Sequence, residues 1–288
     1  MSLPAIATAS TAVVAQADSE AQLLALWLHG RPATTARAYR REAARFLAFV
    51  GRPLRQVTLG DVQAFADSVT GKPATHARAV NAVKSLCGFA HKIGYLPFDA
   101  ARPVRLPRRR NELSARILAE ADVHRLLALE GNARNSALLR LLYAGGLRVS
   151  EACGLRWQDV QARAEGGQVT VFGKGGKTRA VLLSAATFQE LEALRHGQDG
   201  AAPVFASAKG GPLGPVQAWR IVKAAAARAG LAAPVSPHWL RHAHASHALD
   251  RGAPVHVVRD TLGHGSLQTT SAYLHARPGD SSARYLAV

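Results

Sequence analysis

The sequence contains little cysteine and no long apolar run, and both absences limit what the protein can be. Cys87 and Cys153 are the two cysteines in 288 residues, which is too few for a disulfide scaffold. A membrane-spanning helix needs about 20 consecutive apolar residues, and no segment provides them. We therefore exclude a disulfide-rich mini-protein and a membrane protein, and we expect a protein of the reducing cytoplasm.

Acidic residues are also scarce relative to basic ones. The 36 Lys and Arg residues against 19 Asp and Glu give a formal net charge of +17. This excess indicates a polyanionic partner, either nucleic acid or an anionic membrane surface. Apolar residues make up 48% of the chain, as in folded globular proteins. At roughly 150 residues per domain, the length predicts about two domains.

Charge and proline content divide the chain near residue 112. Residues 1–112 contain 16 basic and 7 acidic residues, and residues 113–288 contain 20 and 12, so both parts are basic. The run ARPVRLPRRRNE at the division is typical of a linker. We predict a flexible tail over 1–18, a helical domain over 19–103, a linker over 104–115, a second domain over 116–278 and a C-terminal tail over 279–288. Two such domains could close around a nucleic acid, although a merely basic soluble surface would have the same charge.

The start of the chain has some features of a secretory signal. MSLPAIATASTAVVAQA contains an apolar stretch and ends in Ala-Gln-Ala. It lacks the basic residues that precede such a stretch, and Pro4 and Thr8 interrupt it. A flexible tail is therefore favoured over a cleaved signal peptide.

Both parts have the apolar spacing of helices, with one exception. In the first part, the signals are a stripe over Leu23, Trp27 and Leu28, N-caps at Thr34 and Thr35, stops at Gly51 and Gly94, and helical spans over 59–69 and 75–93. In the second part, helices are expected over 185–195, 215–229, 238–249, 255–262 and 268–275. The exception is a β-hairpin, predicted because β-prone runs over 168–172 and 178–183 flank the glycine-rich GKGGK.

Two segments of the second part contain basic residues suited to binding phosphate. In YAGGLRVSEACGLRWQDV, Arg148 comes just before a helix expected to begin near Ser150. Its guanidinium and the free amides of that helix could grip a phosphate, although an arginine there is more often a surface cap. In GKGGK, Lys174 or Lys177 could enter a groove. Each signal is weak alone.

Two further segments add histidine, arginine and tyrosine. SPHWLRHAHASHAL places His238 and Arg241 three residues apart, and thus on one face of a helix. LGHGSLQTTSAYLH has a tight turn at His264 followed by a helix that carries Tyr273.

The order Arg, Lys, His-x-x-Arg, Gly-His, Tyr resembles that of the tyrosine recombinases, also called phage integrases. LRVSE, GKGGKTR, HWLRHAHASHAL and LGHGSLQTTSAYLH follow the family's order and spacing, including nine residues from His264 to Tyr273, and WLHGRPATTARAYRREAARFLAF resembles its N-terminal DNA-binding domain. The resemblance covers nearly the whole chain. It implies a mainly α fold with a small antiparallel β-sheet, in which an all-helical DNA-binding domain precedes a mixed α/β catalytic domain.

The resemblance implies site-specific DNA recombination without metal, ATP or another cofactor. Tyr273 would attack a DNA phosphate and hold the strand through a 3′-phosphotyrosine bond, which preserves the bond energy for rejoining through a Holliday junction. Such chemistry needs a nucleophile, neutralisation of the charge on the phosphate oxygens, and a proton for the departing 5′ oxygen.

The resemblance also implies a role for each motif residue. Arg148 and Arg241 would clamp the nonbridging oxygens. His238 would accept a proton from, or hydrogen bond to, the reacting phosphate and tyrosine, and His264 would be a second donor to the phosphate. Lys174, on a mobile hairpin, would be the general acid for the leaving group.

Double-stranded DNA is the expected partner, held by a homotetramer in the cytoplasm, on the nucleoid. An accessory recombinase or a DNA-bending protein is a further candidate partner, and no membrane is expected. The candidate DNA-contacting residues are Arg37, Arg41, Arg78, Lys84, Lys177 and Arg220. Arg37 and Arg41 lie on the helix expected between Thr34 and Gly51. A solvent-exposed charged face without DNA contact explains them equally well.

Other interpretations stay open at this point. A zinc site would use His238 and His242, four apart as in HExxH, but Trp239 stands where that motif has glutamate. The histidines His242, His244 and His247 are then packing or hydrogen-bonding residues. Tyr285 is the rival nucleophile, and its apolar tail could instead couple subunits. A type IB topoisomerase and a catalytically silent DNA-binding protein are the alternative functions.

Overall fold

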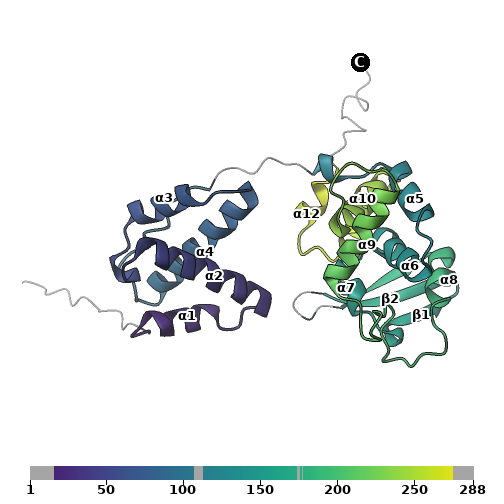
Figure 1. The fold of residues 1–288 in the computed structure, drawn as a ribbon, viewed down its shortest axis with the longest axis horizontal. Helices are drawn as coiled ribbons and strands as arrows, with labels where there is room; N and C mark the ends of the chain where they lie inside the picture. Colours follow the sequence, from purple (N-terminus) through teal and green to yellow (C-terminus); the bar gives the residue numbers. More distant parts are fainter. Residues whose placement is uncertain (1–15, 107–112, 174–175, 177, 275–288) are drawn as a thin grey trace, which may run out of the picture. The chain divides into compact units, whose positions relative to one another are not determined.

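A computed structural model describes residues 16–106, 113–173, 176 and 178–274 of the chain. The chain divides into two compact units, residues 1–110 and residues 111–288, and each is described by itself (Figure 1). Lys174, Lys177 and the predicted C-terminal tail with Tyr285 lie outside the described residues.

The first unit is a bundle of helices. Its elements are α1 (Glu20–Leu28), α2 (Ala33–Val50), the short 3-10 helix η1 (Leu54–Gln56), α3 (Leu59–Ser68) and α4 (Pro73–Lys92). The long helix α4 packs against α1, α2 and α3. Leu23, Trp27, Phe46 and Phe65 are buried at the centre of this core. The predicted helical fold of this part is confirmed.

Two local predictions for the first unit are wrong. Helix α2 begins at Ala33 with Pro32 as its N-cap and no side-chain cap; proline suits a helix start because it has no N–H that would be left without a partner there. Thr34 and Thr35 therefore lie inside the helix. The packed chain also begins before residue 19, since Ala17 is buried in the core and the Gln16 amide donates to the Ile93 carbonyl at 3.3 Å.

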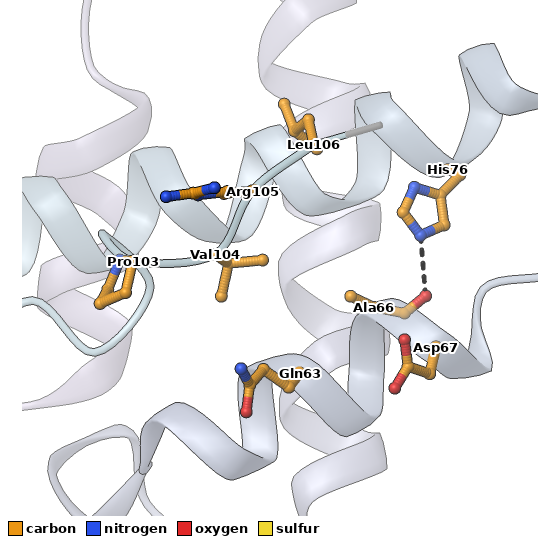
Figure 2. Close-up of a pocket in the computed structure, with 8 residues that line it drawn as sticks. All are labelled: Gln63, Ala66, Asp67, His76, Pro103, Val104, Arg105 and Leu106. Atoms are coloured by element: carbon orange, nitrogen blue, oxygen red, sulfur yellow. Dashed lines mark hydrogen bonds between the residues drawn. The ribbon is translucent and has the colours of Figure 1, made fainter. Parts of the chain in front are cut away.

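The segment after α4 is packed onto the first unit. Val104 is buried in its core, and the Lys84 ammonium donates to the carbonyls of Arg102, at 2.9 Å, and of Val104. A pocket of about 670 Å³ opens beside this segment. Figure 2 shows the pocket's lining residues and the hydrogen bond from the His76 ring to the Ala66 carbonyl, 2.9 Å long. The predicted linker over 104–115 thus begins as packed chain.

The second unit combines helices with a small sheet. Its helices are α5 (Glu120–Ala128), α6 (Ala133–Ala144), α7 (Val149–Gly154), α8 (Ala185–Glu192), α9 (Pro215–Arg228), α10 (Pro237–Asp250), α11 (Val255–Leu262) and α12 (Leu267–Ser271), with 3-10 turns η2 (Ser114–Arg116) and η3 (Trp157–Asp159). Its strands are β1 (Val160–Arg163), β2 (Gly166–Phe172) and β3 (Thr178–Leu183). The mainly α fold with a small antiparallel sheet is confirmed.

The strands are antiparallel in the order β1-β2-β3 within the described residues. Val169 of β2 pairs with Val160 and with Val181, and these side chains are buried. Helix α8 lies against β2 and α6 (Figure 1). One face of the sheet thereby joins the main core of the unit.

Two differences from prediction in this unit bear on the site and the sheet. Strand β1 was not predicted, because its short sequence VQAR exposes every residue after Val160 and so lacks a strand's alternation. Helix α12 ends at Ser271 rather than running to residue 275. Tyr273 therefore lies in the turn after the helix, where its amide donates to the Thr270 carbonyl at 3.0 Å.

Among the residues that the structure describes, no helix has both the length and the apolar character needed to cross a membrane.

Candidate active site

The predicted catalytic residues that the structure describes come from separate elements of the second unit. Arg148 is the N-cap of α7, and Arg241 lies on α10 after His238 in the first turn of that helix. His264 follows α11, and Tyr273 follows α12. Hydrogen bonds and ring contacts bring these positions together around the C-terminal end of α11.

Three consecutive carbonyl groups at that end each accept a hydrogen bond from a different arginine. Arg179 Nε donates to the Thr261 carbonyl at 2.7 Å. Arg241 Nη2 donates to the Leu262 carbonyl. Arg148 Nη2 donates to the Gly263 carbonyl at 3.2 Å. The free carbonyls of a helix end carry partial negative charge that attracts cations. The end of α11 thus gathers three guanidinium groups beside the turn that carries His264.

The carboxylate of Glu151 joins two of these arginines. It accepts from Arg148 Nη1 at 2.8 Å and from Arg179 Nη1 and Nη2 at 2.9 and 2.8 Å. Burial alone would raise the pKa of Glu151, but the hydrogen bonds from Arg179 and Arg148 outweigh it and lower that pKa to about 2. Glu151 is therefore ionised at neutral pH. With three guanidinium groups and one carboxylate, the cluster carries a net positive charge.

The sequence predicted that free backbone amides at the start of α7 would help to bind a phosphate. The structure differs from this prediction. Glu151 Oε2 accepts the backbone N–H of Arg148 at 2.8 Å. The anion at this helix start is thus supplied by the protein itself. Phosphate binding by Arg148 has to come from its guanidinium.

Arg241 is almost completely buried, with 2% of its surface exposed. Besides the Leu262 carbonyl, it donates to the carbonyl of Gly146, a residue whose positive φ of 59° suits glycine. Burial, together with Arg148, lowers the pKa of Arg241 to about 10, so it stays cationic at neutral pH. A guanidinium has five N–H groups, and the two carbonyls engage only two, so further donors remain for an anion.

Tyr273 is buried, and its hydroxyl is held by a histidine. Its ring packs in a small core with Ile117, Val258 and Leu262. The hydroxyl lies 2.7 Å from His242 Nδ1. Burial raises the pKa of Tyr273, although Arg241 opposes this. The phenol is thus neutral at neutral pH and donates its proton to the hydrogen bond.

The sequence placed His238, rather than His242, next to the tyrosine. In the described residues the hydrogen bond to the Tyr273 hydroxyl comes from His242. His238 lies beside His242, with 5.3 Å between the ring centroids. His238 thus contacts His242, and it is His242 that contacts the Tyr273 hydroxyl.

The histidines of the site are held in the neutral form. Burial, reinforced by nearby positive groups, lowers the pKa of His242 and of His264 to about 4 each and also lowers the pKa of His238. His264 lies nearly parallel to the Tyr273 ring, with centroids 6.4 Å apart. Its Nδ1 is 2.9 Å from the Thr270 hydroxyl, so Nε2 is the ring nitrogen available to a phosphate.

The other two histidines of α10 have structural contacts. His244 Nδ1 bonds to the Tyr143 carbonyl at 2.8 Å. His247 bonds to the Tyr143 hydroxyl at 2.9 Å and to the Leu118 carbonyl at 3.0 Å. Their predicted role as hydrogen-bonding residues is confirmed. Across the described ranges, no three His, Cys, Asp or Glu side chains gather into a metal-binding group.

Sequence reasoning missed the roles of Glu151, Arg179 and His242. The i,i+3 spacing of Arg148 and Glu151 was a usable signal for an ion pair. The sequence contains no such signal for Arg179, because its partner Glu151 lies 28 residues away. His242 is one helical turn from His238, and spacing alone does not show which of them reaches the tyrosine.

The candidate DNA-contacting residues differ in their surroundings. Arg37 and Arg220 are exposed on α2 and α9. Arg41 and Arg78 both approach the buried carboxylate of Glu42, at 2.8 and 3.7 Å, with their side chains largely exposed. Lys84 is different, because its ammonium is already bound to backbone carbonyls.

Comparison with known proteins agrees with this geometry. Residues 116–279 match the model of the phage integrase family. The tyrosine recombinase XerD of Mycobacterium tuberculosis is 36% identical over 275 residues, covering 85% of this chain and 88% of that protein. The tyrosine recombinase XerC of Rhodospirillum centenum is 39% identical over 275 residues, covering 86% and 80%. The chain belongs to the phage integrase family, and it is a tyrosine recombinase.

Solved structures share the fold at lower identity. The XerH site-specific recombinase bound to its difH substrate superposes with a TM-score of 0.70 at 22% identity, covering 94% of this chain and 84% of that one. A lambda integrase tetramer bound to a Holliday junction gives 0.71 at 18% identity, covering 87% and 76%.

Proposed function

We propose that this tyrosine recombinase breaks and rejoins duplex DNA at specific sites through a covalent bond between Tyr273 and a 3′ phosphate. The observation that carries the proposal is the cationic cluster at the end of α11, next to the turn whose His264 ring stacks on the Tyr273 ring. Positive groups fixed before the reaction stabilise charge as it develops on a phosphate. Tyr273 is then the nucleophile, and the arginine cluster stabilises the charge that its attack creates on the phosphate.

Each side chain then has a distinct task. Arg148 and Arg241 bind the nonbridging oxygens, and His264 and His238 donate to the same phosphate. The Tyr273 oxygen bonds to phosphorus as the bond to the 5′ oxygen breaks, and Lys174 supplies the proton to that oxygen. The phosphotyrosine bond keeps the energy of the broken bond, so a 5′ hydroxyl from another strand reverses the step without ATP.

The exposed arginines Arg37, Arg41, Arg78 and Arg220, with Lys177, are the proposed contacts to duplex DNA. Lys84 is not among them, because backbone carbonyls bind its ammonium. A tetramer that exchanges strands through a Holliday junction is proposed from the fold shared with the lambda integrase tetramer. Two basic parts of one chain support binding of the polyanion by both units.

Covalent capture from a random-sequence pool of nicked duplexes tests this function and also finds the site. A nick near the cleavage point lets the short leaving strand diffuse away, which traps the phosphotyrosine adduct. We expect adducts that survive denaturation and share one sequence. Tyr273→Phe should bind the selected duplex and form no adduct. An undiminished adduct in that variant would overturn the assignment of Tyr273.

The same selected duplex separates recombination from its alternatives. A recombinase converts two copies into exchanged products, with a four-way junction as intermediate. Relaxation of supercoiled plasmid without exchanged products would indicate a topoisomerase. Sequence-specific binding without any adduct would indicate a DNA-binding protein that lacks catalysis.

A further inference from the structure

The Tyr273 hydroxyl has a partner that the motif comparison did not assign. His242 Nδ1 lies 2.7 Å from the hydroxyl oxygen, which is a short, well-formed hydrogen-bond distance. The two rings lie 5.7 Å apart between centroids and are tilted by 46°. His242 therefore touches the atom that becomes the nucleophile.

The protonation states fix the direction of this hydrogen bond. Burial, together with His238, Arg116 and Arg241, lowers the pKa of His242 to about 4, and burial raises the pKa of Tyr273. At neutral pH the phenol thus carries the proton and Nδ1 accepts it as a hydrogen bond. The neutral imidazole has its own hydrogen on Nε2, which faces away from the hydroxyl.

Other charged and titratable groups around the pair do not compete for this proton. Arg241, on the same helix, donates to two backbone carbonyls. His264, from the turn after α11, stacks beside the Tyr273 ring and bonds to Thr270. Arg148 donates to Glu151 and to Gly263. Among these groups, His242 is the one with an acceptor nitrogen on the hydroxyl.

We propose that His242 is the catalytic base that takes the proton of Tyr273 during DNA cleavage and returns it during rejoining. As the Tyr273 oxygen forms its bond to phosphorus, its O–H bond breaks and the proton moves to His242 Nδ1. The electron pair of the breaking P–O bond leaves with the 5′ oxygen, which takes its proton from a separate acid.

Binding of DNA makes this transfer feasible. In the free protein, the high proton affinity of the buried phenol keeps the proton on Tyr273. A bound phosphate adds negative charge beside His242 and offsets the arginines that disfavour its protonated form. Bond formation to phosphorus lowers the proton affinity of the tyrosine oxygen at the same moment. The inference rests on the proposed attack by Tyr273.

Replacement of His242 by asparagine separates proton transfer from orientation. The amide oxygen of asparagine occupies nearly the position of Nδ1 and accepts the same hydrogen bond, but it does not take a proton at neutral pH. With the nicked duplex selected by covalent capture, we expect His242→Asn to bind normally and to cleave about 100-fold more slowly, the usual size of a general-base effect. His244→Asn is the matched control, because His244 lies on the same helix and contacts a Tyr143 carbonyl instead.

Fluorinated tyrosine at position 273 supplies the second readout. Fluorine on the ring makes the phenol more acidic, so attack depends less on a base. We expect 3-fluorotyrosine to recover part of the lost rate in His242→Asn, and to give no such recovery in His244→Asn.

Three results would overturn this role. A cleavage rate for His242→Asn within about threefold of the wild-type rate would show that accepting a hydrogen bond is sufficient. A loss that fluorotyrosine leaves unchanged would make His242 a structural residue. If the wild-type protein forms no adduct, the proposed function itself fails and this role fails with it, whereas the first two results leave the function intact.

Discussion

Arg179 donates two hydrogen bonds to the carboxylate of Glu151, at 2.9 and 2.8 Å. This fork joins strand β3 to helix α7, and the same carboxylate accepts from Arg148. A guanidinium in this planar, two-point arrangement fixes the orientation of a carboxylate better than an ammonium does. Arg179 therefore positions Arg148 through Glu151, without itself needing to touch DNA.

Removal of Arg179 should damage both stability and cleavage. Arg179→Ala leaves the nearly buried Glu151 with one arginine, and breaking a buried ion pair costs about 3 kcal/mol. Urea unfolding measures this loss, and the adduct assay should show slower cleavage with half-site binding retained. Arg179→Lys should restore charge but not the fork, so its cleavage should remain impaired. Arg125→Ala is the control, because its pair with Asp122 is exposed on the surface of the same unit and contributes at most about 0.5 kcal/mol.

Gly146 should tolerate no side chain. Its φ is 59°, and a Cβ there would lie 2.8 Å from His244 and Leu262 side-chain atoms. We expect Gly146→Ala to lower the free energy of unfolding by more than about 1 kcal/mol, since backbone strain and collision add. Gly230→Ala is the matched control: its φ is 68° with nothing within 4 Å of a Cβ, so it reports the backbone cost alone. Equal losses in the two variants would contradict the packing around Gly146.

Acid should weaken the second unit through three of its partly buried histidines. The pKa values of His242, His244 and His264 are each lowered to about 4 from 6.5. The unfolded chain therefore binds more protons below pH 6.5, and stability must fall as pH decreases from there toward 4. Above pH 6.5 these groups are neutral in both states and add no dependence. Urea midpoints across pH 4–8 measure the slope, which should be shallower in His244→Asn; an unchanged slope would remove His244 from the explanation.

Salt should weaken DNA binding steeply if exposed arginines contact phosphates. The slope of log K against log salt is about −0.9 for each neutralised phosphate. Arg220→Ala, which removes an exposed charge on α9, should reduce that slope by about one. Arg125→Ala is the control, because Arg125 is engaged by Asp122 at 2.7 Å. A wild-type affinity that is flat in salt would contradict phosphate clamping.

Periodicity located the helices because their apolar stripes are regular. The helix predicted over 255–262 has those bounds in α11, where a glycine follows directly. Strand β1 escaped because three of its four residues are exposed, so its place depends on pairing with β2 rather than on its own sequence. The early end of α12 likewise depends on packing, since the Tyr273 ring turns into a core with Ile117 from far along the chain.

The motif residues could be named from the sequence, but their partners could not. Arg148 and Arg241 stand in short patterns, whereas the carbonyls and carboxylate that hold them come from distant elements. His238 and His242 share a helix face, and the choice between them depends on where the turn after α12 places one hydroxyl. Contacts across long sequence separations are set by the fold as a whole.

The arginines at the end of α11 are anchored by backbone carbonyls, and this has an evolutionary consequence. Every residue has a carbonyl, so the acceptors at Thr261 and Leu262 survive any change of side chain that keeps the backbone path. Natural variants can therefore diversify at these positions while the charged cluster keeps its geometry. Selection should act there on the course of the main chain, and on Gly263 with its left-handed φ of 62°, more than on side-chain identity.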